Sequence, residues 1–191
     1  MKTVGIVLAA GESRRMGSPK ALLKGTDGIP LAAKQAQVLQ AGGCGCAVVV
    51  VGARAAEVRA GLGGLATVEN PRWAHGRASS LQAGIGAHPE ADGYLFLPVD
   101  AAGVKVGTVR AILAAAGAEP TTIWRPVHRG VKGNLLWIPR KAAETLMALA
   151  ADARVDEWAK PLARELDVDD PAILRNINTP EDWRQVVTAG N

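Results

Sequence analysis

Short apolar runs alternate along this chain with longer segments whose apolar residues recur at helical spacing. The apolar runs predict strands at residues 4–8, 47–51, 65–69, 94–99, 121–124 and 134–138. The segments between and after them predict helices at residues 30–41, 54–61, 78–87, 106–116, 140–151 and 156–165, with a last helix starting at Pro180. The continuously apolar run 47–51 is typical of a strand that is covered on both faces.

Strands that alternate with helices favour an α/β fold. We expect a three-layer α/β/α arrangement with a Rossmann-like, open and mostly parallel sheet. No repeat, low-complexity linker or change in composition divides the chain, so residues 1–191 are expected to form a single domain. In such sheets ligands bind beyond the carboxyl ends of the strands, which directs attention to the loops that follow Leu8, Glu69, Val99 and Ile138.

Composition and charge narrow the classes of function. With 191 residues, 48% of them hydrophobic, the chain can bury a core of its own. Its net charge of +4 fits either an ordinary basic surface or attraction to phosphate-bearing ligands. A nucleic-acid partner is not expected, because no aromatic residues are interleaved with a dense run of Lys and Arg. No membrane-spanning run and no targeting segment is visible, so we expect a soluble, cytoplasmic protein with no membrane partner.

A glycine-rich and cationic loop follows the first predicted strand, with the sequence LAAGESRRMGSPK over residues 8–20. Its small residues let the backbone approach phosphate oxygens, and successive amides can form an anion cradle. Arg15 can present a forked pair of donors to a phosphate, and Lys20 a point charge near the α-phosphate of a nucleoside triphosphate. The loop is neither a P-loop nor a Rossmann fingerprint. An ordinary polar loop is the alternative, which the two arginines, two glycines and one lysine in so short a span disfavour.

The pattern L-A-A-G-x-S-x-R-M-G-x-P-K resembles the signature of the MobA-like nucleotidyltransferases. Four later segments resemble the same family, at residues 69–81 (ENPRWAHGRASSL), 97–100 (LPVD), 133–134 (GN) and 176–182 (NINTPED). The first of these is most similar to the molybdenum cofactor cytidylyltransferases. The resemblance implies a fold like that of the nucleotide-diphospho-sugar transferases. It also implies transfer of a nucleotidyl group, with CMP from CTP favoured, to a phosphorylated small-molecule acceptor such as molybdopterin, with release of pyrophosphate.

The resemblance also implies a set of site residues. Lys20, Arg15 and Asp100 are expected to act in catalysis, and Asp100 and Asn178 to bind Mg²⁺. The residues expected to contact the nucleotide are Leu8, Ala9, Ala10, Gly11, Ser13, Arg14, Arg15, Met16, Gly17, Lys20, Gly76, Arg77 and Ser80.

Several of these positions also admit purely structural interpretations. Ser80 is a common residue near the start of a helix, Asp100 could cap a strand end, and Asn178 could belong to a turn before a helix. Arg125 and Lys132 lie toward the acceptor half, where they could either meet an anionic substrate or face water.

Three segments depart from the family pattern. Asp100 is followed by two alanines instead of the usual D-x-P, and residues 133–135 read GNL where the cytidylyltransferases have G-H-P. The second change leaves recognition of a pterin acceptor open. Asn176 and Asn178 replace two aspartates, which predicts weaker magnesium binding because the site carries less negative charge.

Two alternatives to a cytidylyltransferase remain from the sequence. One is an enzyme of the same class that is specific for GTP or for a sugar phosphate. The other is a nucleotide-binding carrier, chaperone or regulator of cofactor maturation that has lost turnover, with a molybdoenzyme or maturation factor as its partner. A monomer or a weak dimer is expected in each case.

Overall fold

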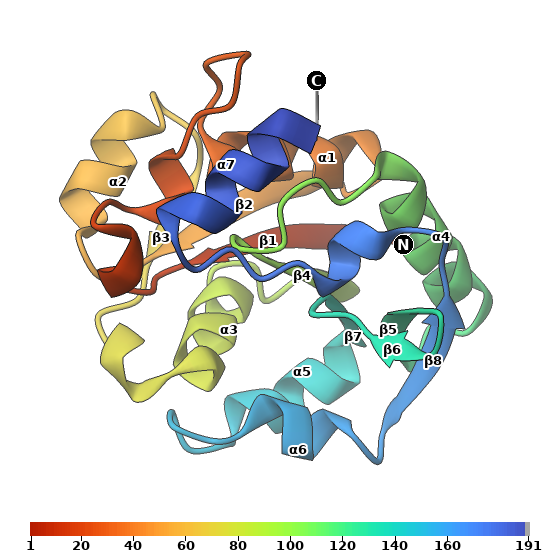
Figure 1. The fold of residues 1–191 in the computed structure, drawn as a ribbon. Helices are drawn as coiled ribbons and strands as arrows, with labels where there is room; N and C mark the ends of the chain where they lie inside the picture. The colour runs from red at the N-terminus through yellow and green to blue at the C-terminus, as the bar shows by residue number, and fades with distance from the viewer. Residues whose placement is uncertain (190–191) are drawn as a thin grey trace.

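A mixed sheet of eight strands runs through the centre of the protein (Figure 1). The computed structural model describes residues 1–189, so the last two positions of the predicted domain lie outside it. The strand order is β3-β2-β1-β4-β7-β5-β6, and β8 also pairs with β5. The strands are β1 (Thr3–Ala9), β2 (Cys46–Val51), β3 (Thr67–Glu69), β4 (Gly93–Pro98), β5 (Ile123–His128), β6 (Val131–Lys132), β7 (Leu136–Pro139) and β8 (Ala163–Asp167).

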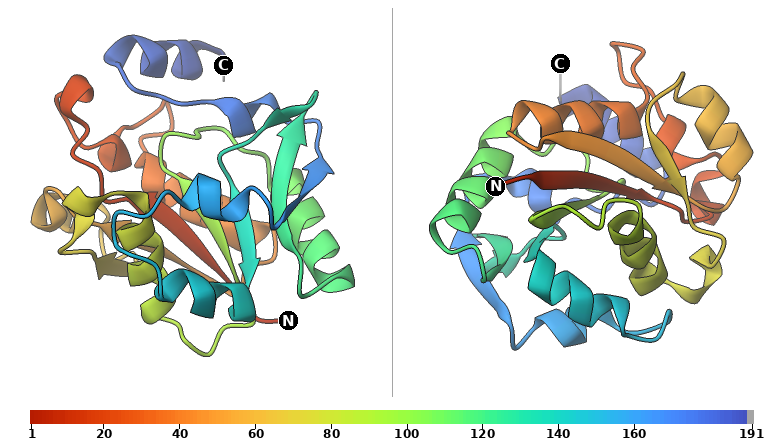
Figure 2. Two further views of the ribbon diagram at one scale, coloured as in Figure 1. Left: turned by 90° about the horizontal axis from the view of Figure 1, so that it is seen from below. Right: turned by 180° about the vertical axis from the view of Figure 1, so that it is seen from behind.

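Helices cover both faces of this sheet (Figure 2). They are α1 (Leu31–Ala41), α2 (Ala55–Gly61), α3 (Arg77–Gly86), α4 (Val106–Ala118), α5 (Arg140–Met147), α6 (Val155–Ala159) and α7 (Pro180–Ala189). Short 3-10 helices are η1 (Arg14–Met16), η2 (Lys20–Leu22), η3 (Trp73–His75) and η4 (Pro171–Leu174). None of the helices within residues 1–189 is both long and apolar enough to cross a membrane.

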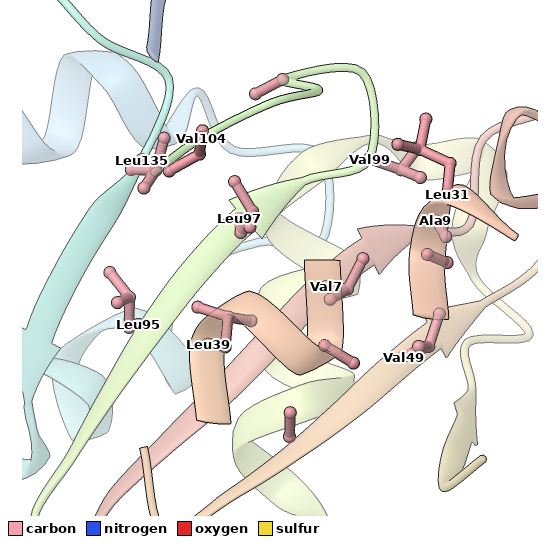
Figure 3. Packing of buried hydrophobic residues seen from close by; sticks show 14 of the residues in the cluster. Val7, Ala9, Leu31, Leu39, Val49, Leu95, Leu97, Val99, Val104 and Leu135 are labelled. Atoms are coloured by element: carbon pink, nitrogen blue, oxygen red, sulfur yellow. The ribbon is translucent and has the colours of Figure 1, made fainter. Parts of the chain in front are cut away.

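The alternation of side chains along each strand produces two hydrophobic clusters, one on each face. In β1, Val7 belongs to the cluster beneath α1, α4 and α7, whereas Ile6 belongs to the cluster beneath α3, α5 and α6. Figure 3 shows the first cluster, in which Leu39 of α1 lies over the sheet near Val7 and Leu95. Both faces are therefore apolar, which explains the unbroken apolar run in β2 and confirms the predicted three-layer α/β/α fold.

The sheet is mostly parallel, as predicted, but β7 reverses direction. Strands β1, β2, β3 and β4 pair in parallel, while β7 is antiparallel to its neighbours β4 and β5. Ile138 therefore lies opposite Tyr94, near the amino end of β4. The expectation that the loop after Ile138 borders the site is wrong, because that loop leaves the opposite edge of the sheet. The loop before β7, residues 133–135, lies at the correct edge instead.

Several predicted element boundaries are wrong for identifiable reasons. The helix predicted at 156–165 ends at Ala159, because Pro161 is incompatible with its continuation, and residues 163–167 form β8. The helix predicted at 140–151 ends at Met147. There the Gln82 side-chain amide donates to the carbonyls of Leu146 and Leu149, at 3.2 and 2.9 Å, and satisfies groups near the helix end. The strand predicted at 121–124 begins at 123 and extends to 128.

Candidate active site

The glycine-rich loop leaves β1 at the carboxyl edge of the sheet and folds back on itself through η1 and η2. Ser13 adopts a left-handed backbone conformation, with φ of 57°, and its hydroxyl accepts a hydrogen bond from the Lys20 amide at 3.2 Å. The amides of Met16 and Gly17 donate to carbonyls inside the same loop. Among the described residues, the amides at positions 11–13 have no acceptor, so this stretch is the part of the loop able to receive an anion.

A cationic pocket of about 250 Å³ lies against this loop. Arg14 forms an exposed ion pair with Glu12, at 2.6 Å, whereas Arg15 has no ion pair among the residues that the structure describes. Four predicted nucleotide-contact residues therefore meet the predicted metal ligand Asn178 around one cavity. The residues that line it are Glu12, Ser13, Arg14, Arg15, Lys20 and Asn178.

Lys20 connects the loop to two other predicted site residues. Its ammonium lies 3.4 Å from Asp100 Oδ2 and 3.0 Å from Asn178 Oδ1, although the three residues are far apart in the sequence. The Lys20 side chain is 11% exposed and that of Asp100 27%. The side-chain oxygens of Asp100 and Asn178 thus converge on a single cation in a partly buried position.

The first turn of α7 holds Asn178 in place. The Asp182 carboxylate accepts hydrogen bonds from the amides of Asn178 and Thr179, at 2.8 and 2.9 Å, and the Asp182 amide donates to the Thr179 hydroxyl. These backbone hydrogen bonds are the main reason that the pKa of Asp182 lies below its ordinary value, and the nearby charge of Arg15 adds to the effect. The Thr-Pro-Glu-Asp helix start thus orients the segment that carries Asn178.

A second pocket of about 250 Å³ lies on the other side of Gly11. Six of its seven lining residues are predicted nucleotide-contact residues. The seventh is Trp73 on η3, an aromatic residue for which the sequence predicted no separate role. The lining residues are Leu8, Ala10, Gly11, Trp73, Gly76, Arg77 and Ser80.

A glycine allows the walls of this second pocket to come together. A Cβ atom built on Gly52 would lie 2.5 Å from Trp73 Cβ and 2.8 Å from the Ala10 carbonyl oxygen. Because the loop after β2 passes so close to both walls, only glycine fits at this position.

Buried Asn70 fixes the segment between β3 and α3. Its side-chain amide donates to the hydroxyls of Ser79 and Ser80, at 2.9 and 3.1 Å, and its carbonyl oxygen accepts from the Arg72 amide. Ser80 therefore has the structural role that its position near a helix start suggested, and it also lines the pocket. For Asn70 itself, the Asn-Pro turn signal at residues 70–71 was the only sign of a structural role in the sequence.

Three predicted contact residues line neither pocket. Ala9 and Met16 are buried in the hydrophobic cluster beneath α1, and Gly17 ends η1 on the exposed side of the loop. A contact from Ala9 or Met16 to a ligand would have to come from the backbone.

The two cations predicted toward the acceptor half differ in their surroundings. Lys132 forms an ion pair with Glu165, at 3.0 Å, in which both side chains are about half exposed. Arg125 is largely buried and pairs with Asp156, at 2.7 Å. Gly133 lies close by, and a Cβ atom there would come within 2.8 Å of the Ile173 side chain.

A larger, mainly aliphatic pocket of about 330 Å³ lies between α1 and α7. Leu31, Val38, Leu97 and Trp183 contribute to its walls, and none of the glycine-rich loop lines it. Its two cations are already engaged, because Lys34 pairs with Asp27 and Arg175 donates to the Ala102 carbonyl. A triphosphate needs cations and free amides, so the two smaller pockets fit such a ligand better.

Most of the chain is similar to known proteins. A family model described as the MobA-like NTP transferase domain matches residues 5–168. The nicotine blue oxidoreductase of Paenarthrobacter nicotinovorans is 39% identical over 195 residues, which span 96% of this chain and 95% of that protein.

Solved structures agree with this match. Rv0371c from Mycobacterium tuberculosis H37Rv has a TM-score of 0.81 at 29% identity, over 98% of this chain and 99% of that chain. A manganese complex of the same protein has a TM-score of 0.75 at 26% identity, over 99% and 100%. CMP:2-keto-3-deoxy-manno-octonic acid synthetase complexed with CTP has a TM-score of 0.74 at 16% identity, over 100% and 98%, which shows a shared fold only.

Proposed function

The chain belongs to the MobA-like NTP transferase domain family, and from this premise we propose that it is a cytidylyltransferase. It transfers CMP from CTP to a phosphorylated small-molecule acceptor and releases pyrophosphate. One observation carries the proposal: Gly11 and Glu12, consecutive in the glycine-rich loop, border an aromatic-lined pocket on one side and a cationic pocket on the other. A base with its ribose and a chain of phosphates need two such compartments in that order.

The reaction requires little covalent chemistry from the protein. An oxygen of the acceptor phosphate attacks the α-phosphorus, a new P–O bond forms, and the bond to pyrophosphate breaks with its electron pair passing to the leaving group. Catalysis then consists mainly of positioning and of neutralising charge. Arg15 and Lys20 line the cationic pocket and supply the positive charge that the developing pyrophosphate requires.

The residues around Lys20 fit a divalent cation. Asp100 and Asn178 already direct two oxygens at one cation, the Lys20 ammonium. Among residues 1–189 there is no cluster of three or more His, Cys, Asp or Glu side chains able to enclose a metal, so phosphate oxygens and water must complete the coordination. Magnesium usually binds in this way, and when bound it would neutralise phosphate charge. The manganese complex of Rv0371c supports a divalent metal in this family.

The choice of CTP rests on residues 69–81, which resemble the molybdenum cofactor cytidylyltransferases and provide Trp73, Gly76, Arg77 and Ser80 to the second pocket. Molybdopterin is the acceptor that this resemblance suggests. GTP as the nucleotide, or a sugar phosphate as the acceptor, is the alternative within the same class.

A second candidate function follows from the relative that is named an oxidoreductase. The same pair of pockets could hold the phosphates and base of a nucleotide redox cofactor, with electron transfer in place of nucleotidyl transfer. A third candidate is a nucleotide-binding carrier in cofactor maturation, which the neutral Asn176 and Asn178 favour because they weaken the metal site.

Ligand-induced thermal shifts and product assays separate these candidates. CTP, GTP, ATP, UTP, NADH and NADPH are titrated with and without Mg²⁺. A ligand at 100 times its Kd stabilises the protein by about 2.7 kcal/mol. Pyrophosphate release is then measured with phosphorylated acceptors, and nicotinamide oxidation with nicotine blue.

We expect CTP with Mg²⁺ to stabilise the protein most and to yield pyrophosphate. Nucleotide binding without pyrophosphate release would favour the carrier, and nicotinamide oxidation would favour the oxidoreductase. No shift with any nucleotide would contradict all three.

A further inference from the structure

Two arginines from distant parts of the chain meet at one carboxylate next to the second pocket. Arg77 begins α3 and Arg125 lies on β5, and both contact Asp156 of α6, at 3.4 and 2.7 Å. The side chains of Arg77 and Arg125 are 28% and 11% exposed, whereas that of Asp156 is 63% exposed. The two cations therefore lie deeper than the anion they share.

The two guanidinium groups have more donors than acceptors. Together they carry about ten N–H groups. Besides the two contacts with Asp156, the only recorded hydrogen bond of either group within the described residues joins Arg77 Nη2 to the Asn134 carbonyl, at 2.9 Å. The Nε atoms of both arginines are buried without a partner. An external ligand cannot reach these buried Nε atoms, but Arg125 Nη1 is not among the buried atoms and has no hydrogen-bond partner within the described residues, so it is open to an acceptor from outside the chain.

The charges at this place are also unbalanced. Two guanidinium groups share one carboxylate, and the nearby Lys132 is paired separately with Glu165. Burial is the largest cause that lowers the pKa of Arg77, and the charge of Arg125 lowers it further, whereas the charges of Asp156 and Asp100 raise it. A second anion placed between the two arginines would relieve this repulsion.

Asn134 stands where the cytidylyltransferases have the histidine of G-H-P, and its own hydrogen bonds are made within the chain. Its backbone amide donates to the Ile173 carbonyl at 3.1 Å, and its side-chain amide donates to the Arg175 carbonyl at 3.3 Å. Asn134 thus ties the loop before β7 to the segment that leads to Asn178. The two arginines retain more unused donors at this edge of the site than Asn134 does.

We propose that Arg77 and Arg125 form an anion subsite that binds the phosphate group of the acceptor. Arg77 lines the pocket that also contains Gly11, so a phosphate held here lies beside the nucleotide and on the acceptor side of it. Guanidinium groups match phosphate oxygens well, and two of them can balance the double negative charge of a phosphate monoester. This inference rests on the proposed function and specifies the acceptor as a phosphate monoester.

Inorganic phosphate serves as the probe, because the acceptor itself is unidentified. Its binding is measured by calorimetry at saturating CTP, so that the glycine-rich loop is already filled, in the wild type and in Arg125→Met. Lys132→Met is the matched control, since it removes a neighbouring cation whose charge is already paired. We expect Arg125→Met to weaken phosphate binding about tenfold or more while CTP affinity and the Lys132→Met variant stay unchanged.

Equal phosphate affinity in the wild type and Arg125→Met would overturn the subsite and leave the proposed function intact. A parallel loss of CTP affinity would also overturn it, because the arginine would then serve the nucleotide. Acetate that binds as tightly as phosphate would refute the monoester assignment.

Two further experiments test the subsite if Arg125→Met does not fold or if the wild type does not bind CTP. If Arg125→Met does not fold, the double variant Arg125→Met/Asp156→Asn removes the whole ion pair and is compared in the same way. If the wild type binds no nucleotide, the proposed function fails, and phosphate titration of the nucleotide-free protein still tests the dependence on Arg125.

Discussion

Replacing Lys20 by Met tests the role of the loop most sharply, because the substitution removes a charge and little volume. The Lys20 ammonium lies 3.4 Å from Asp100 Oδ2, in a position where its side chain is 11% exposed. At an effective dielectric constant of about 20 the direct attraction at this distance is about 5 kcal/mol. The net loss of stability is smaller, because the 27% exposed Asp100 side chain is rehydrated once the lysine is gone.

The stability effect can be bracketed. Exposed pairs contribute up to about 1 kcal/mol, and breaking a fully buried pair costs about 3–5 kcal/mol. The Lys20–Asp100 pair falls between these limits, so we expect a loss of about 1–2 kcal/mol. In a domain of this size that lowers Tm by about 2–8 °C.

The effect on turnover should be much larger. Removing one preorganised positive group from developing oxyanion charge costs about 3–4 kcal/mol, which reduces kcat about 10²–10³-fold. Pyrophosphate release and thermal unfolding are measured together on the same preparation. Lys24→Met is the control, because Lys24 is an exposed lysine close by in the chain, and both its Tm and its turnover should match the wild type.

Turnover retained within about threefold in Lys20→Met would show that Lys20 does not meet the phosphates. A fall in Tm of more than about 15 °C would instead show that Lys20 holds the fold together, and the loss of activity would then say nothing about chemistry.

Three other outcomes follow from the structure. Gly52→Ala should weaken CTP binding, because its new Cβ forces Trp73 and the Ala10 carbonyl apart at a cost of about 1–3 kcal/mol; calorimetry checks this, and unchanged affinity would contradict it. Burial raises the pKa of the Cys44 thiol to about 12, so Cys44 should resist alkylation at pH 8 until the protein is unfolded, and mass spectrometry showing rapid labelling of the native protein would refute this. Asp182→Asn should lower Tm at neutral pH, because the folded protein holds the pKa of Asp182 below the ordinary 3.8 and the carboxylate therefore stabilises the fold above pH 3.8. The difference in Tm between variant and wild type should close as the pH falls through the lowered pKa. A difference that does not change with pH would argue against the carboxylate's hydrogen bonds to the amides at the start of α7.

Local sequence signals were sufficient for most of the sheet. The β-branched run of β2 by itself predicts a strand, and the Thr-Pro-Glu-Asp segment by itself predicts the start of α7. Pro161 also indicates the end of a helix, and the helix predicted at 156–165 did not take this into account. The end of α5 could not be predicted locally, because the Gln82 side chain that donates to the Leu146 carbonyl in its last turn, and to the Leu149 carbonyl beyond it, comes from α3.

Non-local contacts limited the prediction of the site in the same way. The loop at residues 8–20 and the segment 69–81 could be recognised because each is continuous in sequence. The contact between Arg125 and Asp156 could not be recognised in this way. It depends on the reversed direction of β7 and on strand β8 beside β5, which was not predicted. A strand's direction is set by its partners and not by its own residues.

A crystal structure of the protein grown with CTP and Mn²⁺ tests the central claim most directly. We expect phosphate density along the Gly11–Lys20 loop, cytosine in the pocket between Leu8 and Trp73, and an anomalous manganese peak beside Asp100. A nucleotide bound elsewhere, or a loop whose own side chains fill both pockets in saturating CTP, would contradict it.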